Sequence, residues 1–121
     1  MSDRAVYDTM IFFQWAVLPE CRQHRTVKAL YDGPIQLCLS ADTLDEARRL
    51  LTRPELVQRF SLLTSERADA VLREARRLAA WFASVPEHFS LPQHRLDDHL
   101  FDLAIEAKAK YLVTWEGRLL N

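Results

Sequence analysis

Four acidic side chains, far apart in the sequence, have the residue type and the positions that metal-dependent phosphoryl chemistry needs. Asp8 and Glu116 each follow an apolar run. Asp98 opens a helical pattern, and Glu46 lies one turn into another. Carboxylates close together repel, and an unpaired charge removed from water costs several kcal/mol, so such a cluster needs a cation. An all-oxygen ligand set selects Mg²⁺ or Mn²⁺, and these ions promote hydrolysis of phosphodiesters.

Some of these acids have other interpretations, which the residues alone leave open. Asp98, together with its neighbour Asp97, has the residue type expected of a helix cap. Glu46 shares its helix start with two more acids, of which at most one or two can face a cleft. Asp102 and Glu106 continue at helical spacing, which favours a solvated stripe.

Asp8 is the hardest of the acids to explain as a surface residue. It lies between a short apolar strand pattern and the apolar segment MIFFQWAV (10–17). A carboxylate in such a place has little water around it unless the site is a cleft. The aromatic residues of the same segment, FFQW (12–15), could serve a partner contact, but core positions are the favoured prediction.

The segments that would position the acids alternate between strand and helix patterns. Apolar runs at 4–7, 35–39 and 111–115 predict strands, and the proline-flanked run at 85–92 fits an extended connector or edge strand. One helical pattern ends near Gly33. Further helical patterns cover 40–51, with Ser40 as N-cap, and 54–60, 64–83 and 97–109. This alternation implies an α/β fold whose parallel sheet is covered on both faces. Because the carboxyl ends of parallel strands line one crevice, we expect the four acids to converge there.

The composition is that of one soluble globular domain spanning residues 1–121. Hydrophobic residues make up 49% and charged residues 27% of the sequence, with only two glycines and five prolines. No run approaches the roughly 18 apolar residues of a membrane-spanning helix. The first residues lack the pattern of an export signal, so a cytoplasmic location is expected.

Cysteines and basic residues add weaker expectations. Cys21 and Cys38 share no metal-binding spacing and are expected to be reduced, partly buried thiols. The net charge of -1 gives no global attraction to nucleic acid. Arginine supplies 13 of the 16 basic residues, and its guanidinium suits bidentate phosphate contacts or solvated helix faces.

Four stretches, in this order, resemble the PIN-domain family, especially its toxin components of toxin–antitoxin pairs. VYDTMIFF (6–13) is similar to the family's first strand and helix start, with Asp8 as the first metal acid. SADTLDEARRLLTRPEL (40–56) places the second acid at Glu46. DDHLFDLAIEAKAKYLVT (97–114) is the most similar stretch and makes Asp98 the third acid. The family's last acid position falls on Glu116.

The resemblance implies a three-layer α/β/α PIN-like fold with a central, mainly parallel sheet of about four strands. It implies an endoribonuclease that uses Mg²⁺ or Mn²⁺, held by the four acids, and leaves a 5′-phosphate and a 3′-hydroxyl. Thr9, Thr114 and Arg118 are the expected substrate contacts. The expected partners are the RNA substrate, a cognate antitoxin protein and a second copy of the chain, with no membrane.

Departures from the family pattern favour a second hypothesis, a PIN fold that has lost catalysis and acts as an RNA-binding or protein-interaction module. Met10 stands where the family usually has Asn, and Glu116 is one methylene longer than the usual Asp. Arg118 replaces a further acid, and could contact phosphate or pair with Glu116. The sequence ends at Asn121, where relatives usually continue into another strand. Either that edge strand is absent or the product is shortened, and the exposed edge would then need a partner.

Overall fold

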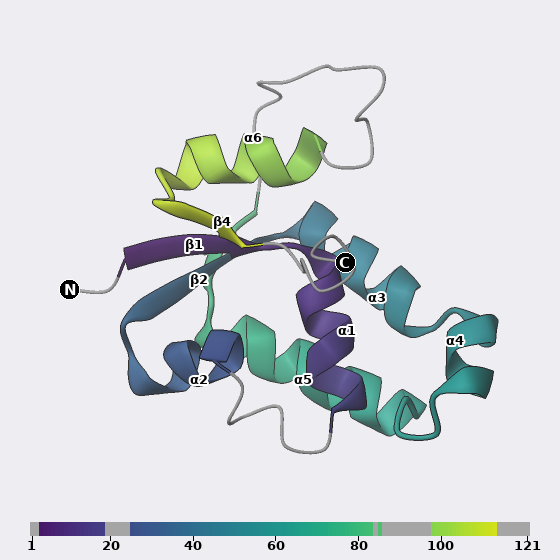
Figure 1. The fold of residues 1–121 in the computed structure, drawn as a ribbon. Coiled ribbons are helices and arrows are strands. Elements are labelled where there is room, and N and C mark those ends of the chain that lie inside the picture. Colours follow the sequence, from purple (N-terminus) through teal and green to yellow (C-terminus); the bar gives the residue numbers. More distant parts are fainter. Residues whose placement is uncertain (1–2, 19–24, 84, 86–97, 114–121) are drawn as a thin grey trace, which may run out of the picture.

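The computed structural model describes residues 3–18, 25–83, 85 and 98–113, which form a four-stranded parallel sheet with helices on both faces (Figure 1). The strand order is β3-β2-β1-β4, and every neighbouring pair is parallel. This confirms the expected α/β fold with a parallel sheet. Along the chain the elements are β1 (Asp3–Tyr7), α1 (Thr9–Val17), α2 (Arg25–Asp32), β2 (Ile35–Ser40), α3 (Ala41–Leu51), α4 (Pro54–Arg59), α5 (Ser65–Leu78), β3 (Ala80–Phe82), α6 (Asp98–Ala107) and β4 (Tyr111–Val113).

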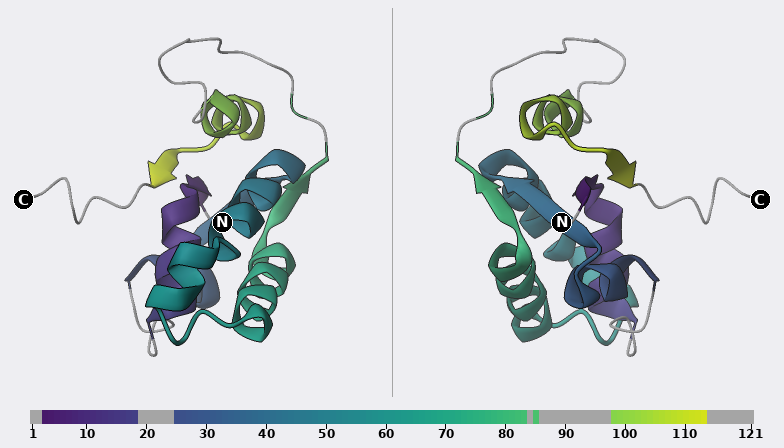
Figure 2. Two further views of the ribbon diagram at one scale, coloured as in Figure 1. Left: turned by 90° about the vertical axis from the view of Figure 1, so that its right-hand side faces the viewer. Right: turned by 90° about the vertical axis from the view of Figure 1, so that its left-hand side faces the viewer.

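Two apolar clusters hold the layers together, one on each face of the sheet. Figure 2 shows α6 on one side of the sheet, with α1, α2 and α5 on the other. Because alternate residues of a strand face opposite sides, Tyr7 and Leu39 join the larger cluster, whereas Val6 and Cys38 pack with Leu103 of α6. Within the described residues, no helix has both the length and the apolar composition to cross a membrane.

Two titratable side chains in these clusters stay protonated. Burial raises the pKa of Tyr7 to about 12, and its hydroxyl donates to the Thr26 carbonyl at 2.7 Å. Burial also raises the pKa of the Cys38 thiol, which is free and fully buried. The prediction of a reduced thiol is confirmed for Cys38, and Cys21 lies outside the described residues.

The aromatic residues of α1 belong to the core, as predicted. Phe12, Phe13 and Trp15 are all buried. The Phe12 and Trp15 rings stack with centroids 6.5 Å apart, and Phe13 meets the edge of Phe60 at 5.1 Å. Helix α1 is thereby fixed against α3 and α5, which sets the direction of the chain where it leaves β1.

The predicted helix at 64–83 is too long. Helix α5 ends at Leu78, and Ala80–Phe82 form the edge strand β3, paired to β2 with Trp81 opposite Leu39. The Gln36 side chain donates to the Leu78 carbonyl at 2.8 Å and satisfies one of the last carbonyls of the helix. Pairing with β2 occupies backbone groups of this segment, so tertiary contact overrides a continuous helical pattern. The expected edge strand at 85–92 lies outside the described residues except for Val85, and so do the last two residues of 111–115.

Ser40 is the N-cap of α3, as predicted, and it fixes the helix that carries Glu46. Its hydroxyl accepts the Thr43 backbone N–H at 3.2 Å and lies 3.1 Å from the Thr43 hydroxyl. Both side chains are buried. Helix α3 therefore starts directly at the carboxyl end of β2, and the direction of its first turns is set by a buried polar contact.

Replacing Ser40 with alanine is expected to lower the free energy of unfolding by about 1–2 kcal/mol, because the cap and the buried hydroxyl contact are both lost. Ser65→Ala is the matched control, since Ser65 is exposed and follows the cap of α5 rather than forming it. That control should change stability by less than about 0.5 kcal/mol. Urea denaturation measures both values, and equal effects would remove the special role of Ser40.

Candidate active site

The four parallel strands bring their carboxyl ends to one edge of the sheet, where the predicted acids should meet. β1 ends at Tyr7, β2 at Ser40 and β4 at Val113, and all run in the same direction (Figure 1). The backbone N–H of Asp8 donates to the Val113 carbonyl at 2.8 Å. The residue that follows β1 is thus tied to the last residue of β4.

Asp8 caps α1, and one of its carboxylate oxygens has no donor in the part of the chain that the structure describes. Its Oδ1 accepts from the Met10 backbone N–H at 3.4 Å and from the Thr9 hydroxyl at 3.3 Å, both long bonds. Among the described residues, none donates to Oδ2 and none forms an ion pair with this half-buried carboxylate. The acid is therefore oriented by its own helix, with an oxygen available to water or a cation.

The Met10 departure leaves this local geometry intact. The contact with Asp8 comes from the Met10 backbone N–H, which any residue except proline supplies. The Met10 side chain packs against the larger core cluster. Thr9, the expected substrate contact, begins α1 beside Asp8.

Glu46 is the acid of the α3 start that turns inward. Asp42 and Asp45 are exposed, whereas the Glu46 side chain is 28% exposed. Its Oε2 pairs with Arg49 of the same helix at 3.1 Å. Helix α3 packs against both α1 and α6, so Glu46 lies on an element that contacts the helices of Asp8 and Asp98.

Asp98 is the first residue of α6, and its side chain lies outside what the structure describes. The backbone still locates it. α6 leads into β4 and runs opposite to the strands, so it begins over the edge where they end (Figure 1). Glu116, Thr114 and Arg118 lie outside the described residues.

Asp102 was expected in a solvated stripe, and that prediction is wrong. Its residue is only 7% exposed, whereas Glu106 is exposed as expected. Asp102 follows Asp98 by four residues, which places both on one face of α6. Sequence reasoning missed this buried acid, because a spacing of four residues marks a shared helix face but not whether that face is buried.

The donor set fits a hard divalent cation in kind. Asp8 and Glu46 offer carboxylate oxygens, the ligands that Mg²⁺ and Mn²⁺ prefer. Among the side chains that the structure describes, no three His, Cys, Asp or Glu residues gather closely enough to hold a metal by themselves. A complete site requires an acid outside that set, and Asp98 and Glu116 are the candidates that the sequence supplies.

One of three comparisons with known proteins identifies a family for the chain. The family model described as "PIN domain" matches residues 4–118, nearly the whole chain. Searches of curated proteins and of solved structures gave no significant match. The matched range contains the four strands of the sheet and the sequence positions of the four predicted acids. The chain therefore belongs to the PIN-domain family, whose members are generally nucleases that bind a divalent metal.

Proposed function

We propose that this protein is a metal-dependent endoribonuclease and the toxin of a toxin–antitoxin pair. The observation that carries the proposal is the half-buried Asp8 carboxylate, which follows β1, is tied through its backbone to Val113 and has one oxygen without a described donor. A nuclease needs such an acid, oriented in advance and free to bind a cation.

In this proposal Asp8, Glu46 and Asp98 hold Mg²⁺ or Mn²⁺, with Glu116 in support. When bound, the ion supplies an activated water and neutralises charge on the phosphate during in-line hydrolysis. The Thr9 hydroxyl and the Met10 N–H keep the Asp8 carboxylate in one orientation. Thr9, Thr114 and Arg118 contact the RNA phosphates.

The ion pair between Glu46 and Arg49 does not prevent metal binding. The Arg49 side chain is 72% exposed, and exposed pairs contribute at most about 1 kcal/mol. Glu46 would therefore give up Arg49 readily if it held a divalent cation together with Asp8 and Asp98. Arg49 would then be free to pair with a phosphate.

The biological setting is part of the same proposal. Cellular RNA as substrate places the protein in the cytoplasm. A cognate antitoxin would insert a segment into the acidic edge and exclude RNA. A homodimer would contain two such acidic edges, one from each copy of the chain.

The purified chain is expected to cleave single-stranded RNA in the presence of Mn²⁺ and to leave 5′-phosphate and 3′-hydroxyl ends. Removal of metal with EDTA should abolish cleavage, and excess Mg²⁺ or Mn²⁺ should restore it, because carboxylates bind these ions reversibly. Gel analysis of an end-labelled RNA measures both effects. RNA binding without cleavage and without metal uptake would instead support the non-catalytic module.

A further inference from the structure

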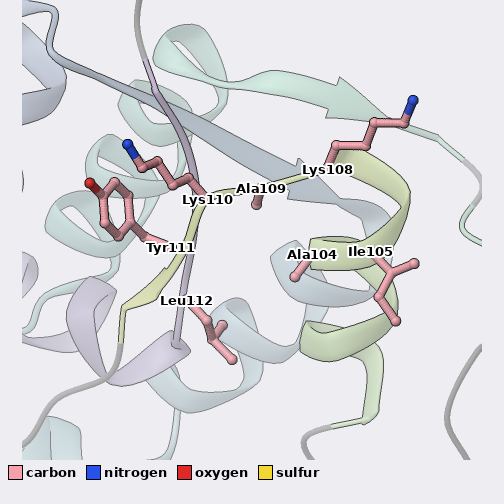
Figure 3. A pocket seen from close by; sticks show the side chains of 7 residues that line it. All are labelled: Ala104, Ile105, Lys108, Ala109, Lys110, Tyr111 and Leu112. Carbon is pink, nitrogen blue, oxygen red and sulfur yellow. The ribbon is translucent and has the colours of Figure 1, made fainter.

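A pocket of about 460 Å³ lies between the second half of α6 and β4, and none of the predicted metal ligands is among its lining residues. This volume is within the range of small-ligand sites. Figure 3 shows Tyr111 and Lys110 on the strand side and Ile105 and Lys108 on the helix side, with small alanine side chains between them. The remaining lining residues are Ala104, Ala109 and Leu112.

Lys108 occupies a backbone position that glycine would fill at lower cost. The Ala109 N–H donates to the Ala104 carbonyl at 2.9 Å, and the Lys108 N–H donates to the Ile105 carbonyl at 3.1 Å. These two bonds form a Schellman motif, which ends α6 and needs a left-handed residue. That residue is Lys108, with φ at 53°. Glycine has no Cβ to strain here, so lysine at this position carries a cost that a role for its charge would offset.

The two lysines of the pocket differ in how their charges are compensated. The Lys110 ammonium lies 3.7 Å from the Asp3 carboxylate and 5.6 Å from the centre of the Tyr111 ring. Lys108 is exposed and pairs with no carboxylate among the residues that the structure describes. Lys108 therefore offers a point charge to an anion, and Lys110 holds the Tyr111 ring from one side.

The apolar lining of the pocket remains open to solvent. Tyr111 is 43% exposed and Ile105 is 45% exposed, and both are among the few large apolar residues that the described core leaves uncovered. An aromatic ring on one side of the pocket and, on the other, a lysine without a carboxylate partner among the described residues can bind a base by stacking and its phosphate by charge. A partner made only of apolar side chains would leave Lys108 without a counter-charge.

We propose that this pocket binds one nucleotide of single-stranded RNA, with the base on Tyr111 and Ile105 and a phosphate on Lys108. The inference rests on the proposed function, in which RNA is the substrate. Tyr111 and Val113 are two strand residues apart, about 7 Å, and Val113 is bonded to Asp8. One RNA strand laid along β4 can therefore occupy the pocket and reach the acidic edge.

The test measures binding of a fluorescein-labelled octauridylate to the full chain by fluorescence anisotropy, with EDTA present to prevent cleavage. Tyr111→Ala should weaken binding about tenfold, because one base loses its stacking surface. Lys108→Gly should reduce the slope of log affinity against log salt by about 0.7, the value for one lost phosphate contact on a single strand. The same Lys108→Gly variant should melt at a higher temperature than the wild type, since glycine relieves the left-handed position.

Lys28→Ala is the matched control, because Lys28 is an exposed lysine on α2, across the sheet from α6. It should leave both affinity and salt slope unchanged. Wild-type affinity and slope in both Tyr111→Ala and Lys108→Gly would overturn the inference. The inference would also be overturned if Lys108→Gly lost affinity for a glutamate-rich peptide but not for the RNA, because the pocket would then be a contact site for a protein.

The two proposals fail separately in this design. Binding is measured in EDTA and cleavage with Mn²⁺, so the first experiment reports on the pocket and the second on the metal site. Loss of binding in the pocket variants without any cleavage activity in the wild type would retain the subsite and remove the nuclease. Cleavage by the wild type, together with normal RNA binding by the pocket variants, would retain the nuclease and remove the subsite.

Discussion

Replacing Asp8 with asparagine is expected to reduce Mn²⁺-dependent RNA cleavage by more than about a hundredfold, with the fold unchanged. Loss of a group that only orients a metal ligand already costs about 10–100-fold, so loss of a ligand charge should cost more. Asparagine is the right variant because it caps helices as well as aspartate does. The Met10 N–H therefore keeps its acceptor, and α1 should start as before. Initial rates on a labelled RNA measure the change.

The matched control for this experiment is Asp45→Asn. Asp45 is an exposed acid on α3, next to Glu46, and its replacement removes the same charge outside the predicted site. Cleavage by this variant should stay within about twofold of wild type. Undiminished cleavage in Asp8→Asn would show that Asp8 is not part of the site. Equal losses in both variants would mean that the change in net charge alone explains the lower cleavage rate.

Replacing Phe12 with alanine is expected to lower the free energy of unfolding by about 3–5 kcal/mol. Phe12 is 1% exposed and stacks on Trp15 at 6.5 Å, in the helix that links the end of β1 to the large apolar cluster. Truncation leaves a cavity that surrounding side chains fill only in part. The total free energy of unfolding of a domain of this size is about 5–15 kcal/mol. The urea concentration at the midpoint of unfolding should therefore fall strongly.

Val57→Ala provides the comparison for the core variant. Val57 lies on α4 and is 42% exposed, so its truncation should cost less than about 0.5 kcal/mol. A loss near that value for Phe12→Ala would mean that α1 is not packed as described. The interpretation of Asp8 would change as well, because α1 orients that carboxylate.

The strands and helices that carry the predicted acids could be read from local signals. A short apolar run followed by Asp8 marked the end of β1, and Ser40 marked the start of α3 through a cap that the structure contains. These signals suffice because caps and strand alternation depend on residues close together in the sequence. The places of Asp8, Glu46 and Asp98 along their elements followed directly, and Glu116 lies outside the described residues.

The errors arose where distant contacts decide the outcome. Ala80–Phe82 continue a helical pattern, yet they pair with β2 because an open position beside that strand accepts their backbone groups. The spacing of Asp102 is compatible with either an exposed or a buried face. Its burial depends on what α6 packs against, which is set by segments far away in the sequence. Local periodicity carries no information on either point.

The central claim is that Asp8 and Glu46 bind the same metal ion, and calorimetric titration with Mn²⁺ tests it most directly. The wild type should bind Mn²⁺, and Asp8→Asn and Glu46→Gln should each weaken binding more than tenfold. The double variant should lose little beyond either single change, because ligands of one ion act together. Wild-type binding in both single variants, or losses that simply add, would contradict a shared site.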